Sequence, residues 1–200
     1  MWGCGPVGQF AIESAYLLGA ERVIAIDQVA ERLEMARTQG KAETIDFSQE
    51  HVLERLRELT GGRDPDACID AIGLEAHGHS IDAIADRVKA ATRVLESDRP
   101  HIFCEEIMAC RKGSTVSVPG VYGSLLDKMP MSAAFAKGLT FKMGLTHVRR
   151  YLSPLFDLIE QGKIGPSFVI THRRRLEDAT AGYDPFANHE DRCSKIVMQP

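Results

Sequence analysis

The sequence opens with Met1-Trp2-Gly3-Cys4-Gly5-Pro6-Val7-Gly8, the stretch that decides its fold class. The three glycines have the G-x-G-x-x-G spacing of a turn between a strand and a helix. The first glycine permits a tight turn, the second lets the backbone approach a pyrophosphate, and the third lets the helix pack closely on a sheet. A pyrophosphate would then lie at the N-terminus of the helix that begins near Pro6. The stretch therefore predicts a dinucleotide-binding turn.

The composition is that of a globular protein. The 200 residues are 44% hydrophobic and 26% charged, and the formal net charge of −4 gives no electrostatic reason to expect binding to nucleic acid. No apolar run in the sequence is long enough to cross a membrane. The five cysteines are odd in number and none has C-x-x-C spacing. They are typical of reduced thiols, so we expect a cytoplasmic protein without a disulfide framework or a zinc knuckle.

After the glycine turn, helical and strand patterns alternate. This βαβαβ order predicts an α/β fold with a doubly wound parallel sheet. The predicted helices cover residues 7–19, 29–38, 51–60, 102–112 and 151–161, with another near residue 81, and the predicted strands cover residues 22–27, 43–47, 67–73, 115–118 and 139–143.

The last part of the chain changes character. A strand is expected at residues 167–172, a short helix at 176–182 and a final strand at 194–198. These elements do not continue the βα alternation in an obvious way. The run Arg173-Arg174-Arg175 is followed at once by two acidic residues, which favours a solvated helix entry.

Asp27 is the first candidate for a cofactor contact. It ends the second strand of the expected fold and lies nineteen residues after Gly8. A carboxylate at this place accepts hydrogen bonds from the ribose of adenosine and repels a 2′-phosphate, so it favours NAD over NADP. The alternative is an N-cap of the helix at 29–38, and the two roles are compatible.

Three further side chains are candidates for the adenosine half of the cofactor. Arg32 would reach the adenine or ribose, or alternatively pair with Glu31 or Glu34 on the protein surface. His77 and His79 follow the strand at 67–73, at the sheet edge where ligands bind in open α/β folds. They are also compatible with a metal pair, although no third ligand is near, or with plain loop residues.

Two later segments complete the expected site and its surroundings. The strand at 115–118 is followed by Pro119 and Val121, whose carbonyl and N–H suit a carboxamide such as that of nicotinamide. The strand at 139–143 is expected at the sheet edge. Because an unprotected edge strand tends to pair with another chain, it is a candidate for homo-oligomer formation.

Six segments of the chain carry a resemblance to a known family: residues 3–27, 59–73, 95–100, 111–123, 137–148 and 166–183. In these segments the chain resembles the C-terminal part of the zinc-dependent medium-chain alcohol dehydrogenases. It is most similar to their branch of glutathione-independent formaldehyde dehydrogenases. The segments follow the family's order over nearly the whole sequence, so the resemblance is more specific than a glycine motif alone.

The resemblance implies an NAD-dependent oxidation of an alcohol or aldehyde hydrate by hydride transfer, with a catalytic zinc as Lewis acid. It also implies a set of cofactor contacts. Gly3, Gly5, Pro6 and Val7 would face the pyrophosphate, Asp27 and Arg32 the ribose, Ile72, His77 and His79 the adenine, Pro119 and Val121 the carboxamide, and Gly144 and Thr146 the nicotinamide.

The resemblance also predicts what this chain lacks. The family's catalytic domain, with its zinc ligands and its structural-zinc lobe, has no counterpart here, so no catalytic or metal-binding residue is assigned. The first Rossmann strand is expected to be missing, which would leave two inner sheet edges open and remove the floor beneath the glycine turn. Residues 1–165 are assigned to an NAD-binding Rossmann domain, and residues 166–200 to a return segment of the absent catalytic domain.

Two hypotheses follow for the function. The first is a truncated NAD-binding domain of an alcohol or formaldehyde dehydrogenase-like oxidoreductase that does not catalyse the reaction alone. The second is a non-enzymatic NAD-binding or degenerate homologue that acts through subunit pairing.

Overall fold

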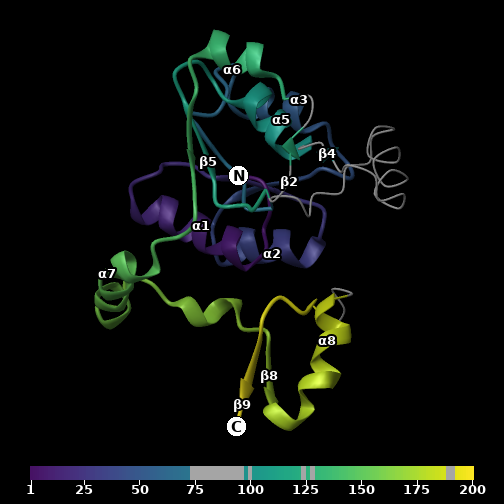
Figure 1. Cartoon of the computed structure of the whole chain (residues 1–200), viewed down its shortest axis with the longest axis vertical. Coiled ribbons are helices and arrows are strands. Elements are labelled where there is room, and N and C mark those ends of the chain that lie inside the picture. Colours follow the sequence, from purple (N-terminus) through teal and green to yellow (C-terminus); the bar gives the residue numbers. More distant parts are fainter. Residues whose placement is uncertain (73–96, 99–100, 123–124, 127–128, 188–191) are drawn as a thin grey trace. The chain divides into compact units, whose positions relative to one another are not determined.

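The computed structural model describes residues 1–72, 97–98, 101–122, 125–126, 129–187 and 192–200 (Figure 1). The predicted helix near residue 81 and both His77 and His79 lie outside these ranges. The chain forms two compact units. The first contains Met1–Gly3, Ile26–Gln28 and Ile45–Thr146, and the second contains Cys4–Ala25, Val29–Thr44 and His147–Pro200.

The first unit is built on a parallel sheet of three strands, in the order β3 (Ala67–Ile69), β5 (Thr115–Val118) and β7 (Thr140–Met143). In the register of the sheet, Cys68 pairs with Val116, and Val116 pairs with Phe141. Val116 and Val118 are buried while Thr115 and Ser117 are half-buried, as expected for a strand covered on both faces. Phe103 of α5 (His101–Ala109) packs edge-on against Phe141, which seats this helix on the sheet.

Trp2 joins this sheet to a second pair of strands. It forms parallel bridges to Ile26 of β1 (Ile24–Asp27) and to Asp70, which follows β3, and β1 pairs with β2 (Glu43–Asp46). The resulting order is β2, β1, Trp2, β3, β5 and β7. This is the 3-2-1-4-5-6 order of a doubly wound dinucleotide-binding sheet, with Trp2 in the place of the first strand. The predicted fold class is thereby confirmed.

The expectation of open inner edges and a missing floor beneath the glycine turn is wrong for Met1–Gly3. The Trp2 N–H donates to the Ile69 carbonyl and the Trp2 carbonyl accepts from the Ala71 N–H, both at 2.9 Å. On the other side, the Met1 carbonyl accepts from Ile26 and the Gly3 N–H donates to the Ile26 carbonyl, again at 2.9 Å. Met1 and Gly3 bond one neighbouring strand and Trp2 bonds the other, because the backbone groups of successive strand residues point alternately to the two sides.

Most helices lie where the periodicity predicts them. They are α1 (Pro6–Leu17), α2 (Ala30–Thr38), α3 (Val52–Leu59) and α5. The sequence patterns missed α6 (Met131–Lys137), which is short and rich in alanine, and ends at Gly138 in the left-handed conformation. They also missed the two-residue strands β4 (Ser97–Asp98) and β6 (Leu125–Leu126), which pair in parallel.

The helix α7 (Val148–Glu160) confirms the prediction for residues 151–161, but its apolar stripe faces outward. None of its thirteen residues is buried, and Leu152, Leu155 and Phe156 are all exposed. The helical spacing of these side chains therefore predicted the helix correctly. The apolar face that it defines is not buried against other described residues.

The predicted strand at residues 167–172 is wrong. A 3-10 turn (Pro166–Val169) occupies most of it, and the strand β8 (His172–Arg175) begins where the prediction ended. Arg173–Arg175 thus belong to a strand rather than to a helix entry. Long arginine stems can lie along a sheet while their guanidinium groups reach solvent, so charge did not exclude this.

The rest of the tail forms a small βαβ arrangement. After a short 3-10 turn (Leu176–Asp178), α8 (Ala179–Ala187) leads to β9 (Ile196–Gln199), which pairs in parallel with β8 and places His172 opposite Ile196. In the yellow part of Figure 1, α8 runs beside these two strands, and it contacts both of them. The alternation of helix and strand thus continues in the tail, contrary to expectation. Across the described ranges, none of the helices combines the length and the apolar character that a membrane crossing requires.

Candidate cofactor site

Gly3 forms the tight part of the turn in the first unit. Its φ is +89°, in the left-handed region that side chains disfavour. A Cβ added here would lie 2.5 Å from Cγ1 of Ile72 and 3.2 Å from the carbonyl carbon of Ala71. Both the dihedral angle and the close approach of the chain after β3 therefore require glycine.

In the second unit, the N-terminus of α1 has the character of an anion-binding site. Gly5 is the N-cap, Pro6 is the first helical residue, and no side chain caps the helix. The first intrahelical bond runs from the Gln9 N–H to the Gly5 carbonyl at 2.9 Å, so the amides of Val7 and Gly8 precede it. Because the first turn also lacks an acidic residue, the positive end of the helix dipole is not offset there.

Gln9 anchors this turn, and sequence reasoning missed it. The residue is 1% exposed, and its Nε2 donates to the Cys4 carbonyl at 2.9 Å and to the Arg32 carbonyl at 3.0 Å. These bonds fix the start of α1 against α2. The available signal was a polar residue directly after Gly8, on the face of the helix that should be buried.

Arg32 lies beside the same turn. Its Cζ and Nη1 are 4.0 Å from the position that a Cβ on Gly5 would occupy. Of its two predicted surface partners, Glu34 is paired with Arg37 within α2. The guanidinium is thus close to the backbone that the motif assigns to the pyrophosphate, whereas the prediction placed it at the ribose.

Asp27 ends β1, as predicted, and is 5% exposed. Its Oδ1 accepts a hydrogen bond from the Gln28 N–H at 2.7 Å. The N-cap of α2 is Val29, and no side chain caps that helix. The alternative role of Asp27 as a helix cap is therefore not seen.

Asp70 is a second residue that sequence reasoning missed. Its carboxylate is fully buried, and it accepts from the Ile72 N–H at 2.9 Å and from the Tyr122 hydroxyl. Its backbone carbonyl accepts from the Gly120 N–H at 2.9 Å. Asp70 thus ties the chain after β3 to the chain after β5. Burial and the hydrogen bond to Asp70 raise the pKa of Tyr122, so its hydroxyl stays a donor at neutral pH.

Two glutamates of α5 lie near this network. Glu106 is fully buried and neither of its carboxyl oxygens has a hydrogen-bond partner among the described residues. Burial, reinforced by the negative charge of Asp70, raises its pKa to about 9, so the carboxyl is protonated at neutral pH. Oε2 of Glu105 accepts from Nε1 of Trp2 at 2.6 Å, and burial raises the pKa of Glu105 as well.

The residues predicted for the nicotinamide end follow β5 and β7. Pro119 and Val121 are exposed and flank Gly120, whose N–H is held by Asp70. Gly144 has a φ of +146°, with open space where a Cβ would be, and Thr146 is exposed. Because β5 and β7 are parallel, both segments leave the sheet at its carboxyl edge, where open α/β sheets bind ligands.

The described residues do not form a zinc site. No three histidine, cysteine, aspartate or glutamate side chains in these ranges are grouped closely enough to hold a metal ion. The catalytic zinc that the resemblance implies therefore has no donor set here, and no chemical step is derived through it.

The comparisons with known proteins agree with this geometry. A family model for zinc-binding dehydrogenases matches residues 6–95. The zinc-type alcohol dehydrogenase-like protein AdhB of Bacillus subtilis is 34% identical over 199 residues, which is 99% of this chain and 51% of AdhB. An alcohol dehydrogenase of Cupriavidus necator is 34% identical over 204 residues, covering 98% of this chain and 47% of the relative.

The chain is similar to zinc-type alcohol dehydrogenases over nearly its whole length. It spans about half the length of the curated relatives it matches. A glutathione-independent formaldehyde dehydrogenase of Bacillus subtilis is also similar, at 31% identity over 99% of this chain and 48% of that enzyme. Because other zinc-type alcohol dehydrogenases match at higher identity, the formaldehyde dehydrogenase branch is not singled out.

Solved structures show the same relationship. The alcohol dehydrogenase TADH from Thermus sp. ATN1 superimposes with a TM-score of 0.78 at 29% identity, over 99% of this chain and 51% of that one. The alcohol dehydrogenase rspB from E. coli CFT073, solved in complex with NADH, gives a TM-score of 0.79 over 100% of this chain and 51% of that one. At 20% identity, this second likeness shows the fold alone.

Proposed function

We propose that this chain binds NAD as the cofactor-binding part of a zinc-type alcohol dehydrogenase-like oxidoreductase. The observation that carries the proposal is the glycine turn. Gly3 is held against Ile72 by the bonds of Trp2 and Gly3 to both neighbouring strands, and the uncapped N-terminus of α1 follows within two residues. That sequence of features suits the pyrophosphate of a dinucleotide.

Each predicted contact has a defined role in this proposal. The amides at the start of α1, with Gly3, Gly5, Pro6 and Val7, bind the pyrophosphate, and Asp27 accepts hydrogen bonds from the ribose. The full proposed set comprises Gly3, Gly5, Pro6, Val7, Asp27, Arg32, Ile72, His77, His79, Pro119, Val121, Gly144 and Thr146. When bound, NAD would supply the hydride acceptor, and these residues would bind and orient it.

The proposed substrate class comes from the names of the relatives. These names suggest an alcohol as the substrate class. An aldehyde hydrate, as for a formaldehyde dehydrogenase, is the more specific proposal. Hydride transfer needs a group that holds and polarises the substrate, and no residue of this chain is assigned that role. We assign residues 1–165 to the NAD-binding domain and residues 166–200 to the return segment of a catalytic domain.

The discriminating experiment is a calorimetric titration of the full chain with NAD and with NADP. We expect NAD to bind more tightly, because the buried Asp27 carboxylate would repel a 2′-phosphate. Asp27→Asn should reduce the preference about tenfold. The control is Asp46→Asn, which removes a carboxylate from the end of the neighbouring strand β2. An unchanged preference in Asp27→Asn would refute the assignment.

A second candidate function is subunit pairing through β7. Among the described strands, β7 pairs with β5 on one side, and three of its four residues are exposed. This supports a homo-oligomer formed along residues 139–143, with or without catalysis.

A further inference from the structure

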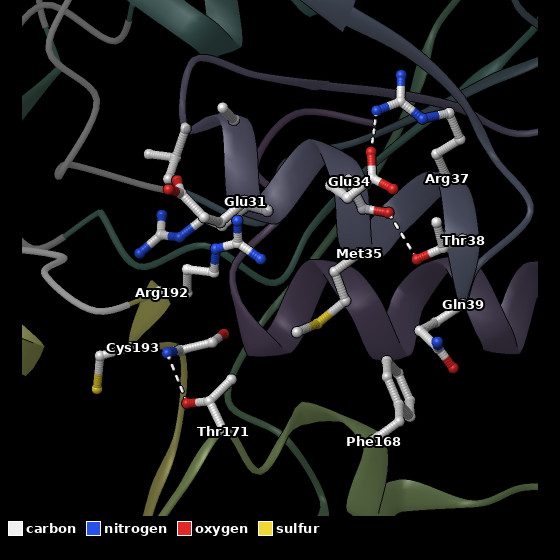
Figure 2. A pocket seen from close by; sticks show the side chains of 14 residues that line it. Glu31, Glu34, Met35, Arg37, Thr38, Gln39, Phe168, Thr171, Arg192 and Cys193 are labelled. Carbon is white, nitrogen blue, oxygen red and sulfur yellow. Dashed lines mark hydrogen bonds and ion pairs between the residues drawn. The ribbon is translucent and has the colours of Figure 1, made fainter.

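The second unit contains a cavity of about 610 Å³ whose walls come from α2 and from the return segment. Figure 2 shows the side chains that line it, with those of α2 above and those of the return segment below. The volume is in the range of sites for small organic molecules. Apart from Arg32, none of the residues proposed to bind NAD lines it.

The middle of the cavity is apolar. Met35 points down from α2 and Phe168 points up from the return segment (Figure 2). The ring of Phe168 packs edge-on against Phe10 of α1 at a centroid distance of 5.7 Å, which fixes one wall. An aromatic or aliphatic body would therefore be accommodated between Met35 and Phe168.

The two ends of the cavity differ in charge. At one end, Arg37 pairs with Glu34, and the Thr38 hydroxyl donates to the Glu34 carbonyl at 2.8 Å, so these groups satisfy one another. At the other end, the exposed Arg192 lies near Glu31 (Figure 2), and Arg32, the next residue after Glu31 in α2, also lines the cavity. This end carries a net positive charge and favours a ligand with one negative charge.

Thr171 and Ser194 form part of the cavity wall on the side of the return segment. Ser194 is 6% exposed, and its Oγ has no hydrogen-bond partner among the described residues. The neighbouring Thr171 hydroxyl is fully used: it accepts from the N–H groups of Ser194 and Lys195 at 3.0 and 3.1 Å, and donates to the Lys195 carbonyl at 3.1 Å. Because the Ser194 Oγ has almost no accessible surface, a ligand in the cavity does not reach it, and recognition is left to Arg192 and the apolar side chains.

From these features we propose that the cavity is a binding site for a small organic anion with an aromatic body, separate from the cofactor site. The apolar part of the ligand lies between Met35 and Phe168, and its anionic group contacts Arg192. The walls of the site lie wholly within the second unit, and Arg32 is the one lining residue that also belongs to the proposed NAD contacts.

The test uses the fluorescent aromatic sulfonate 1-anilinonaphthalene-8-sulfonate, titrated into the full chain. We expect saturable binding at one site. Met35→Trp and Ala30→Phe each add bulk to a wall of the cavity and should weaken this binding at least tenfold. Met108→Trp adds the same bulk to an exposed methionine of α5 and should leave it unchanged. Far-ultraviolet circular dichroism identifies any variant that is unfolded, and the second filling variant then decides.

The charge is tested with a matched pair of probes. Arg192→Gln should weaken binding of the sulfonate about tenfold but should leave binding of its uncharged analogue N-phenyl-1-naphthylamine unchanged. Arg55→Gln, at a surface arginine paired with Glu50 and Glu58, is the control. Equal binding of the sulfonate to the folded filling variants, or to Arg192→Gln, would overturn the proposal.

The site is distinguished from the cofactor site by cross-titration. NADH should not displace the sulfonate, and Asp27→Asn should not affect it. Displacement in proportion to bound NADH would show that the cavity is part of the cofactor site and would overturn the proposal of a separate one. Failure of the chain to bind NADH at all would refute the proposed function. The sulfonate titrations of the filling variants and of Arg192→Gln would still test the cavity.

Discussion

At the scale of single residues, Gly3 combines two constraints that can be separated by experiment. Gly3→Ala meets both a left-handed backbone and the Ile72 side chain, whereas Gly19→Ala meets only the backbone strain, because Gly19 has a φ of +93° and open space around it. We expect Gly19→Ala to cost about 1 kcal/mol in the free energy of unfolding, and Gly3→Ala about 1–3 kcal/mol more. Urea denaturation measures both losses. Equal losses would show that the Ile72 side chain moves aside without lowering the free energy of unfolding.

Glu106 should make stability depend on pH. Its folded pKa of about 9 lies above the ordinary value of 4.5, so between these limits the unfolded chain releases a proton that the folded chain keeps. The free energy of unfolding therefore falls as pH rises from about 4.5 to 9. Glu106→Gln should remove this contribution to the pH dependence. The contribution is a loss of about 3 kcal/mol in the free energy of unfolding between pH 4.5 and 7.

The measurement for Glu106 is a set of urea denaturation curves across this pH range. The exposed Glu54→Gln controls for the loss of a carboxyl group on a helix. A Glu106→Gln variant whose pH dependence matches that of the original chain would show that Glu106 is ionised in the folded state.

At the scale of elements, Lys137 holds the C-terminus of α5. Its Nζ donates to the carbonyls of Ile107, Met108 and Cys110 at 3.0, 2.6 and 2.7 Å. Lys137→Met should destabilise the fold by about 1–2 kcal/mol, because three carbonyls at the negative end of the helix lose a charged donor. Lys163→Met, at an exposed lysine after α7, is the control. Thermal unfolding compares the two, and equal midpoints would contradict the capping role.

Elements that depend on local sequence patterns were predicted correctly, whereas roles that depend on contacts between distant parts of the sequence were not. The glycine turn, β1 ending in Asp27, and α3 rest on local patterns, and the structure places them as expected. Asp70 and Gln9 could not be assigned, because their roles depend on loops or helices that are distant in the sequence. The arginines of β8 were misassigned because the pairing with β9 outweighs their charge pattern.

At the scale of the whole molecule, β7 pairs on one side only among the described strands, and its other side is the candidate surface for association between subunits. The Thr140 N–H donates to Ser114 on the β5 side, so the Met143 N–H points to the other side. If subunits pair here, Met143→Pro should weaken association at least tenfold, since proline removes that donor. Met143→Ala shortens the same side chain and keeps the N–H. Sedimentation velocity distinguishes them, and identical profiles for the original chain and Met143→Pro would exclude this seam.

The bonds of Trp2 to both neighbouring strands also make the chain its own spectroscopic probe. Trp2 is the single tryptophan, it is 1% exposed, and its indole N–H is bonded to Glu105. Its emission therefore reports one place only, the centre of the sheet beneath the glycine turn. Separation of Met1–Gly3 from β1 and β3 would shift that emission to longer wavelength. Because NADH absorbs where a buried indole emits, energy transfer would report a dinucleotide bound above this residue, without any label being attached.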